Sequence, residues 1–344
     1  MTLFDRRTFI KSGAALAAGS VAAGLSLPGC SNASLSSLPP LRIGICSDLH
    51  HDLIFDSHER LGAFVDAMNH EEVDFIIQLG DFCFIRPENR SILDVWNRFD
   101  GPAWHVIGNH DPELTRNVDD VVDFWDMPAS YYSFDSNGYH FVVLNGNDPN
   151  PHRTVPEYFN RYIGEEQLEW LENDLAATSL PTIIFTHQGL ENTIGGVENG
   201  QRIRIALEEA NVHAGQRKVL AVFSGHHHKD YHNVINGIHY IQINSMSYHW
   251  QGELYIDLEA FTEEQYAQFP RLRNITLYAD PLWAVARISA NGTMTLEGRS
   301  SDFVGRSPRE LGMPERRHDY PVVPEISSRE IALTREPYTK NQPV

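Results

Sequence analysis

The chain has 344 residues, of which 42% are hydrophobic and 10% aromatic, so it can bury the core of one large or two small domains. With 27 Lys and Arg against 46 Asp and Glu, its formal net charge is −19. This charge excludes a protein that binds a nucleic-acid polymer by neutralising many phosphates, because such a protein needs stripes of Lys and Arg.

The first residues predict an export signal rather than part of the fold. Arg6-Arg7 precedes an Ala- and Gly-rich apolar stretch, Gly13 to Leu27, that is too short and weakly apolar to favour a membrane span. The pattern resembles a twin-arginine signal peptide, and the alternative is a basic amphipathic helix. We therefore expect residues 1–29 to direct the protein to the periplasm or the cell surface.

Leu27 to Cys30 resembles a lipoprotein cleavage box, although Pro28 occupies a place where a small residue is usual. Lipidation of Cys30 would make the protein a membrane-anchored lipoprotein, and simple cleavage nearby is the alternative.

Beyond this signal, composition predicts three parts of the chain. We expect a Ser- and Pro-containing linker over residues 30–40, a folded domain over 41–312, and a polar, Pro-rich surface tail without chemistry over 313–344. Cys46 and Cys83 cannot form a disulfide framework and lie in or after apolar runs, so we expect buried thiols.

Apolar runs typical of strands alternate with segments of helical spacing, which predicts an α/β fold. The predicted strands are 41–46, 73–79, 103–107, 131–135, 139–144, 182–185, 218–223, 231–234, 238–243, 283–288 and 294–296, and the predicted helices are 58–70, 91–99, 164–177 and 201–212.

Five of the strands end in side chains that can bind a metal ion or transfer a proton. These side chains belong to Asp48, His50, Asp81, Asn109, His110, Asp111, His187, His226, His227 and His228. Each motif alone is weak, because Gly-Asn is ordinary turn chemistry and Asp81 could cap a helix. Their repetition at strand ends favours one site, since ligands bind outside the carboxyl ends of parallel strands.

These blocks, Asp-x-His, Gly-Asp, Gly-Asn-His-Asp, His and Gly-His-x-His, appear in this order between about residues 43 and 228. The chain thereby resembles the calcineurin-like metallophosphoesterase superfamily. The resemblance implies a two-layer sandwich of mixed β-sheets flanked by α-helices, with the site at the strand C-termini. It also implies that metal-activated hydroxide hydrolyses a phosphomonoester or phosphodiester in a small phosphorylated substrate.

The resemblance further implies two divalent or trivalent metal ions. Asp48, His50 and His228 would hold the first, Asn109, His187 and His226 the second, and Asp81 would bridge them. Oxygen and imidazole ligands without thiolate suit Mn, Fe or Zn better than Ca. Because Phe84 stands three residues after Asp81, the tyrosinate-bound ferric site of purple acid phosphatases is not expected.

His110 would stabilise the phosphoryl group or protonate the leaving oxygen, and Asp111 would orient His110 or raise its basicity. Asn109 and His110, with His227 and His249, are the expected substrate-binding residues. The same blocks leave two alternatives open, a nucleotide diphosphate or cyclic-nucleotide hydrolase of this fold, and a non-catalytic phosphate-binding module. They leave the oligomeric state open as well.

Overall fold

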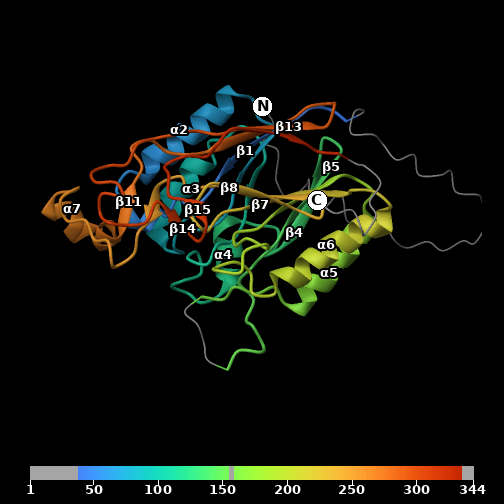
Figure 1. Ribbon diagram of the computed structural model, residues 1–344, viewed down its shortest axis with the longest axis horizontal. Coiled ribbons are helices and arrows are strands. Elements are labelled where there is room, and N and C mark those ends of the chain that lie inside the picture. Colours follow the sequence, from blue (N-terminus) through green and yellow to red (C-terminus); the bar gives the residue numbers. More distant parts are fainter. Residues whose placement is uncertain (1–37, 155–158, 335–344) are drawn as a thin grey trace, which may run out of the picture. The chain divides into compact units, whose positions relative to one another are not determined.

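The computed structural model describes residues 38–154 and 159–334 (Figure 1). The predicted twin-arginine signal and Cys30 lie outside the described residues. In the described part of the chain, every helix is too short or too polar to cross a membrane.

The first sheet holds three of the five strands that carry the motifs. β1 (Leu41–Cys46), β2 (Phe75–Gln78) and β3 (Ala103–His105) are parallel, with β1 paired to β2 and β2 to β3. On the other side of β1 follow the antiparallel strands β12 (Ala284–Ile288), β13 (Thr293–Glu297) and β16 (Arg329–Ala332). The order β16-β13-β12-β1-β2-β3 makes this a mixed sheet.

The second sheet, also mixed, holds the other two motif strands. Its order is β4 (Tyr132–Ser136), β5 (Tyr139–Val143), β6 (Thr182–Phe185), β7 (Val219–Ser224), β9 (Ile238–Gln242) and β8 (Tyr231–Ile235). The central strands β5, β6, β7 and β9 are parallel, and the edge strands β4 and β8 are antiparallel to their neighbours. The edge hairpins turn at Asn137-Gly138 and Asn236-Gly237, whose positive φ angles are those of a two-residue hairpin turn.

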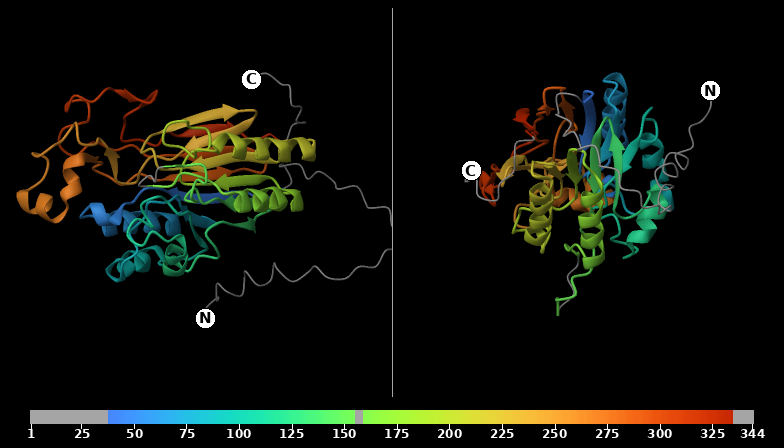
Figure 2. Two further views of the ribbon diagram at one scale, coloured as in Figure 1. Left: turned by 90° about the horizontal axis from the view of Figure 1, so that it is seen from below. Right: turned by 90° about the vertical axis from the view of Figure 1, so that its right-hand side faces the viewer.

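Helices cover the strands, except that the last helix, Glu263–Gln268, lies with smaller elements at one end of the fold (Figures 1 and 2). The helices are α2 (Ser57–His70), α3 (Arg90–Trp96), α4 (Val118–Trp125), α5 (Glu165–Ala177), α6 (Gly200–Ala214) and α7 (Glu263–Gln268). The smaller elements are the 3-10 turns η2 (His51–Leu53), η3 (Pro87–Asn89) and η4 (Pro270–Asn274) and the two-stranded sheets of β10 (Tyr248–Trp250) with β11 (Ile275–Leu277) and β14 (Arg316–Arg317) with β15 (Tyr320–Pro321).

Successive side chains of the central strands point to opposite faces of the sheet, so each strand contributes to two layers of the core. On β5, Phe141 and Val143 face the core shared by the two sheets, whereas Val142 lies in the core beneath α5 and α6. Phe75 of the first sheet meets Phe141 of the second edge to face, with ring centroids 5.0 Å apart. Each of these side chains is buried and contributes roughly 1.5–3 kcal/mol to stability, so the packed sheets form a firm base for the loops at their ends.

The structure confirms the predicted two-layer sandwich of mixed sheets with flanking helices. It also confirms that Cys46 and Cys83 are buried free thiols. The expectation of a surface tail after residue 312 was wrong, because β16 pairs with β13 as an edge strand of the first sheet. Ile331 of this strand is buried. The polar, Pro-rich sequence around it gives no sign of a buried strand.

Candidate dinuclear metal site

The predicted ligands lie in the loops directly after β1, β2, β3, β6 and β7, at the C-terminal ends of these strands. Five of the seven have φ angles in the left-handed region, namely Asp48, His50, Asp81, His226 and His228. Such angles are uncommon for residues other than Gly and cluster at functional sites, where the surrounding fold holds them. The sharp turns bring side chains from both sheets to one place.

Asp48, His50 and His228 form the first group of ligands. Their donor atoms lie within 4.8 Å of one another. The Nε2 atoms of His50 and His228 are 3.2 Å apart, and Asp48 Oδ1 is 3.2 Å from His228 Nε2. Ligands bound at about 2.0–2.2 Å to one cation are separated by roughly 3 Å or a little more, so this spacing suits a metal.

Asp81, His187 and His226 form the second group, within the same limit of 4.8 Å. His187 Nε2 lies 3.2 Å from His226 Nδ1 and 3.2 Å from the Oδ1 atom of Asn109. Asn109 therefore adds an amide oxygen to the second group. The structure thus brings together all seven predicted ligands.

Asp81 lies between the two groups. Its Oδ2 atom is 3.6 Å from His50 Nε2 in the first group and 3.2 Å from His187 Nε2 in the second. One carboxylate oxygen can therefore face both cations. Its other oxygen, Oδ1, accepts the backbone N–H of His110 at 2.8 Å, which fixes the carboxylate plane.

The protonation states suit metal binding, which needs ionised carboxylates and neutral imidazoles. Burial lowers the pKa of His50 to about 3 and holds that of His226 well below its usual range. For Asp48, burial is outweighed by His228, which keeps the carboxyl pKa below normal. His187 differs: burial opposes its charge, yet the Asp81 carboxylate raises its pKa to about 9, so a cation must displace a proton there.

Neighbouring backbone groups orient the imidazoles. His187 Nδ1 is 2.7 Å from the carbonyl oxygen of Leu79, and His228 Nδ1 is 2.8 Å from that of Tyr248. A ring nitrogen that donates to a carbonyl leaves Nε2 with its lone pair free for a metal. The donor set therefore fits two cations in both chemistry and orientation.

His110 lines the pocket beside the ligands, but its partner differs from our expectation. Its Nδ1 atom lies 2.6 Å from Oε2 of Glu113, not against Asp111. The Asp111 carboxylate instead accepts backbone N–H groups of Gly108, Asp81 and Phe82 at 2.6–3.0 Å, tying the two motif loops together. The residue that orients His110 is therefore Glu113, and not Asp111 as the sequence predicted.

The histidines expected near the substrate have separate environments. His227 belongs to neither ligand group, since its Nε2 lies 2.9 Å from the carbonyl oxygen of Ile194 and its Nδ1 near Tyr231. His249 hydrogen-bonds through Nδ1 to the carbonyl oxygen of His228 at 3.2 Å. Both line the pocket, as expected.

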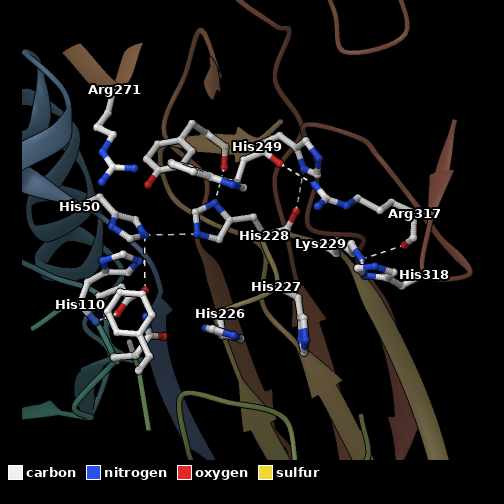
Figure 3. Close-up of a pocket in the computed structure, with 15 residues that line it drawn as sticks. His50, His110, His226, His227, His228, Lys229, His249, Arg271, Arg317 and His318 are labelled. Atoms are coloured by element: carbon white, nitrogen blue, oxygen red, sulfur yellow. Dashed lines mark hydrogen bonds and ion pairs between the residues drawn. The ribbon is translucent and has the colours of Figure 1, made fainter. Parts of the chain in front are cut away.

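The pocket has a volume of about 430 Å³ and is shown in Figure 3. Lining residues that the sequence did not reveal are Phe159, Lys229, Tyr248, Trp250, Arg271, Arg317 and His318. The segment around His249 gave the one signal toward them, because it follows a strand end close to the Gly-His block. Arg271 and Arg317 belong to no recognisable sequence motif.

Gly108 allows the loops after β2 and β3 to approach closely. A Cβ atom at this position would lie 2.2 Å from the backbone nitrogen of Asp81, which cannot move aside cheaply. We expect Gly108→Ala to cost about 1–3 kcal/mol of unfolding free energy and to weaken metal binding, measured by urea unfolding and by metal content. Gly62→Ala in α2, whose added Cβ meets nothing closer than 3.8 Å, is the control and should be neutral or stabilising. Equal stability and metal content in both variants would contradict the role of Gly108.

Comparisons with known proteins agree with this geometry. The family pattern of calcineurin-like phosphoesterases matches residues 41–230, more than half of the chain. A manganese-dependent ADP-ribose/CDP-alcohol diphosphatase from Oryza sativa is 27% identical over 223 residues, which cover 49% of this chain and 67% of that protein. A 3′,5′-cyclic-nucleotide phosphodiesterase from Nostoc is 23% identical over 258 residues, or 71% of this chain and 90% of that protein.

The fold is similar to that of a dimetal phosphatase from Danio rerio, with a TM-score of 0.55 and 15% identity over 78% of this chain and 99% of that one. The chain belongs to the calcineurin-like phosphoesterase family. It is a metal-dependent hydrolase of phosphoric esters with two metal ions.

Proposed function

We propose that Asp48, His50 and His228 hold one cation, that Asn109, His187 and His226 hold the other, and that Asp81 bridges them. The observation that carries this assignment is the position of Asp81 Oδ2, which lies 3.6 Å from His50 Nε2 and 3.2 Å from His187 Nε2. A lone structural carboxylate would need one basic partner, whereas this oxygen faces one imidazole of each group.

When bound, the two cations lower the pKa of a water molecule and draw charge from the phosphoryl oxygens during an in-line displacement. His110 is the residue of this chain that acts on the substrate itself. Its imidazole stands at the pocket and either donates a proton to the leaving oxygen or a hydrogen bond to the phosphoryl group. Glu113 holds Nδ1 of His110 and so directs Nε2 toward the substrate.

The substrate is a small phosphorylated compound, a phosphomonoester or phosphodiester. The pocket of about 430 Å³ suits a molecule of nucleotide size. Two relatives, named for diphosphate and cyclic-nucleotide hydrolysis, support nucleotide-like substrates as alternatives. A non-catalytic phosphate-binding module is disfavoured, because the ligand set is complete and His110 lies beside it.

Stripping and reloading the metals tests this function. The purified mature protein is treated with a chelator, reloaded with Mn²⁺, Fe²⁺ or Zn²⁺, and assayed on p-nitrophenyl phosphate and bis(p-nitrophenyl) phosphate. We expect hydrolysis to disappear on stripping and to return with at least one metal. A reloaded protein that binds phosphate but hydrolyses neither ester would establish the non-catalytic module instead.

We further propose that residues 1–29 form a twin-arginine signal peptide and that Cys30 is lipidated, with residues 30–40 as a spacer to a catalytic domain that begins at residue 41. Arg6-Arg7, the apolar stretch to Leu27 and the box around Cys30 support this export route to the periplasm or cell surface. A Cys30→Ser variant should then move from the membrane to the soluble fraction. A wild-type protein that is already in the soluble fraction would count against lipidation.

A further inference from the structure

One side of the pocket carries positive charge that the metal site does not use. Lys229, Arg271 and Arg317 line it together with His249, and we call these four residues the cationic wall. In Figure 3, His228 and His249 lie between Arg271 and the group of Lys229, Arg317 and His318. Three of the four wall residues follow residue 230, where the family match ends.

Lys229 is a buried cation, with 3% of its surface exposed. Its Nζ atom donates to the carbonyl oxygen of Arg317 at 2.8 Å and lies 3.2 Å from Nδ1 of His318. Within residues 38–154 and 159–334 it forms no ion pair, although the charge of Asp319 partly offsets the effect of burial, which lowers the pKa of its ammonium group. A buried ammonium without a carboxylate is costly, which favours an anion in the pocket.

The protein neutralises neither arginine of the wall, of which Arg317 is half-buried and Arg271 is exposed. Arg317 donates through Nη1 to the carbonyl oxygen of Trp250 at 3.1 Å, and the Arg271 guanidinium lies 5.8 Å from the centre of the Trp250 ring. In the described part of the chain, neither guanidinium group forms an ion pair with Asp or Glu, although the protein has 46 acidic residues against 27 basic ones. Asp81 is the one carboxylate among the described lining residues, and it belongs to the metal site.

His249 supplies an independent observation. The residue is 1% exposed, and its Nε2 atom has no hydrogen-bond partner among the described residues. Buried polar atoms in native proteins are nearly always paired, and among the unpaired buried atoms of the described residues this one belongs to a side chain that lines the pocket, where a bound group can pair with it. His249 lines the same pocket as Arg271 and Arg317.

We propose that the cationic wall binds a second phosphate group of the substrate, so that the enzyme prefers diphosphate-linked compounds to esters with a single phosphate. This inference rests on the proposed function, in which the metal groups hold the phosphoryl group that is attacked. Guanidinium groups match phosphate oxygens in geometry and charge, and the cations of the wall offset the negative charge of the second phosphate.

The cationic wall would distinguish between the two kinds of substrate for which the relatives are named. A 3′,5′-cyclic nucleotide has one phosphate and leaves the wall unused, whereas a nucleoside diphosphate derivative fills both positions. In its hydrolysis, the water oxygen bonds to the phosphorus at the metal groups and the bridging P–O bond breaks. The bridging oxygen leaves with the second phosphate, which the wall holds, and the two water protons go to the two phosphate products.

The kinetic test compares ADP-ribose, 3′,5′-cyclic AMP and bis(p-nitrophenyl) phosphate as substrates. Arg271→Gln and Arg317→Gln remove one charge each, and Arg273→Gln and Arg316→Gln are matched controls from η4 and β14 that do not line the pocket. We expect each wall variant to lower kcat/KM for ADP-ribose about 10- to 100-fold more than for the other two substrates. The control variants should not lower kcat/KM for one substrate more than for the others.

A binding measurement keeps the inference separate from the proposed function. By calorimetry, α,β-methylene-ADP should bind the wild type at least about tenfold more tightly than AMP, and the double variant of Arg271 and Arg317 should lose this advantage. Equal losses on all three substrates, or no preference of the wild type for the diphosphate analogue, would overturn the wall's role. If the protein hydrolyses no ester, the proposed function is wrong. The comparison of α,β-methylene-ADP with AMP then still shows whether the cationic wall binds a second phosphate.

Discussion

The variant Asp81→Asn is expected to lose most of its phosphoesterase activity and at least one of its two metal ions. An asparagine has one neutral oxygen in place of a shared carboxylate, so it cannot neutralise both cations. Asp81 Oδ2 faces an imidazole of each ligand group, at 3.6 Å from His50 Nε2 and 3.2 Å from His187 Nε2. We expect a fall in kcat/KM larger than the roughly 10- to 100-fold cost of removing a group that merely supports a ligand.

Elemental analysis of the same preparations links the two effects. Asp66→Asn is the matched control, because this carboxylate lies on the surface of α2 with 66% of its side chain exposed. The control should keep wild-type activity and both metals. An Asp81→Asn protein with two metals and unchanged turnover would contradict the bridging role.

His110→Asn is expected to lower kcat by about 10²- to 10⁴-fold while leaving the metal content unchanged, because His110 acts on the substrate and is not a ligand. Proton donation to the leaving oxygen predicts a larger loss with an alkyl phosphate than with a p-nitrophenyl ester, whose leaving group needs no proton. Stabilisation of the phosphoryl group predicts the same loss with both. Loss of metal from His110→Asn would instead place His110 among the ligands.

Glu113 acts through His110 and not on the substrate. Its Oε2 atom lies 2.6 Å from Nδ1 of His110, so Glu113→Gln should lower kcat with little change in KM. In the His110→Asn background the same substitution should have almost no effect, because the group that it positions is gone. Independent, additive losses would show that Glu113 acts elsewhere.

Strand ends and ligands could be predicted because their signals are local. An apolar run followed by Asp81 or Asn109 gives both the strand and the side chain at its carboxyl end, and parallel strands bring such ends together. The orienting partner of His110 was mistaken because Asp111 is its neighbour in sequence. A turn, in which the N–H of Glu113 donates to the carbonyl oxygen of His110, brings Glu113 back to the imidazole.

The cationic wall could not be predicted from the sequence. Lys229, Arg271 and Arg317 are separated by 42 and 46 residues, and each lies in an irregular or very short element. Their proximity follows from how β10, η4 and β14 pack over the end of the sheets, which no periodicity encodes. For the same reason composition predicts a tail over residues 313–344, although β16 lies at the edge of the first sheet.

Anomalous diffraction from a crystal of the manganese-loaded protein tests the two-metal centre most directly. It should show two neighbouring peaks, one bounded by Asp48, His50 and His228 and the other by Asn109, His187 and His226, with Asp81 touching both. A single peak, or peaks away from these side chains, would contradict the dinuclear site.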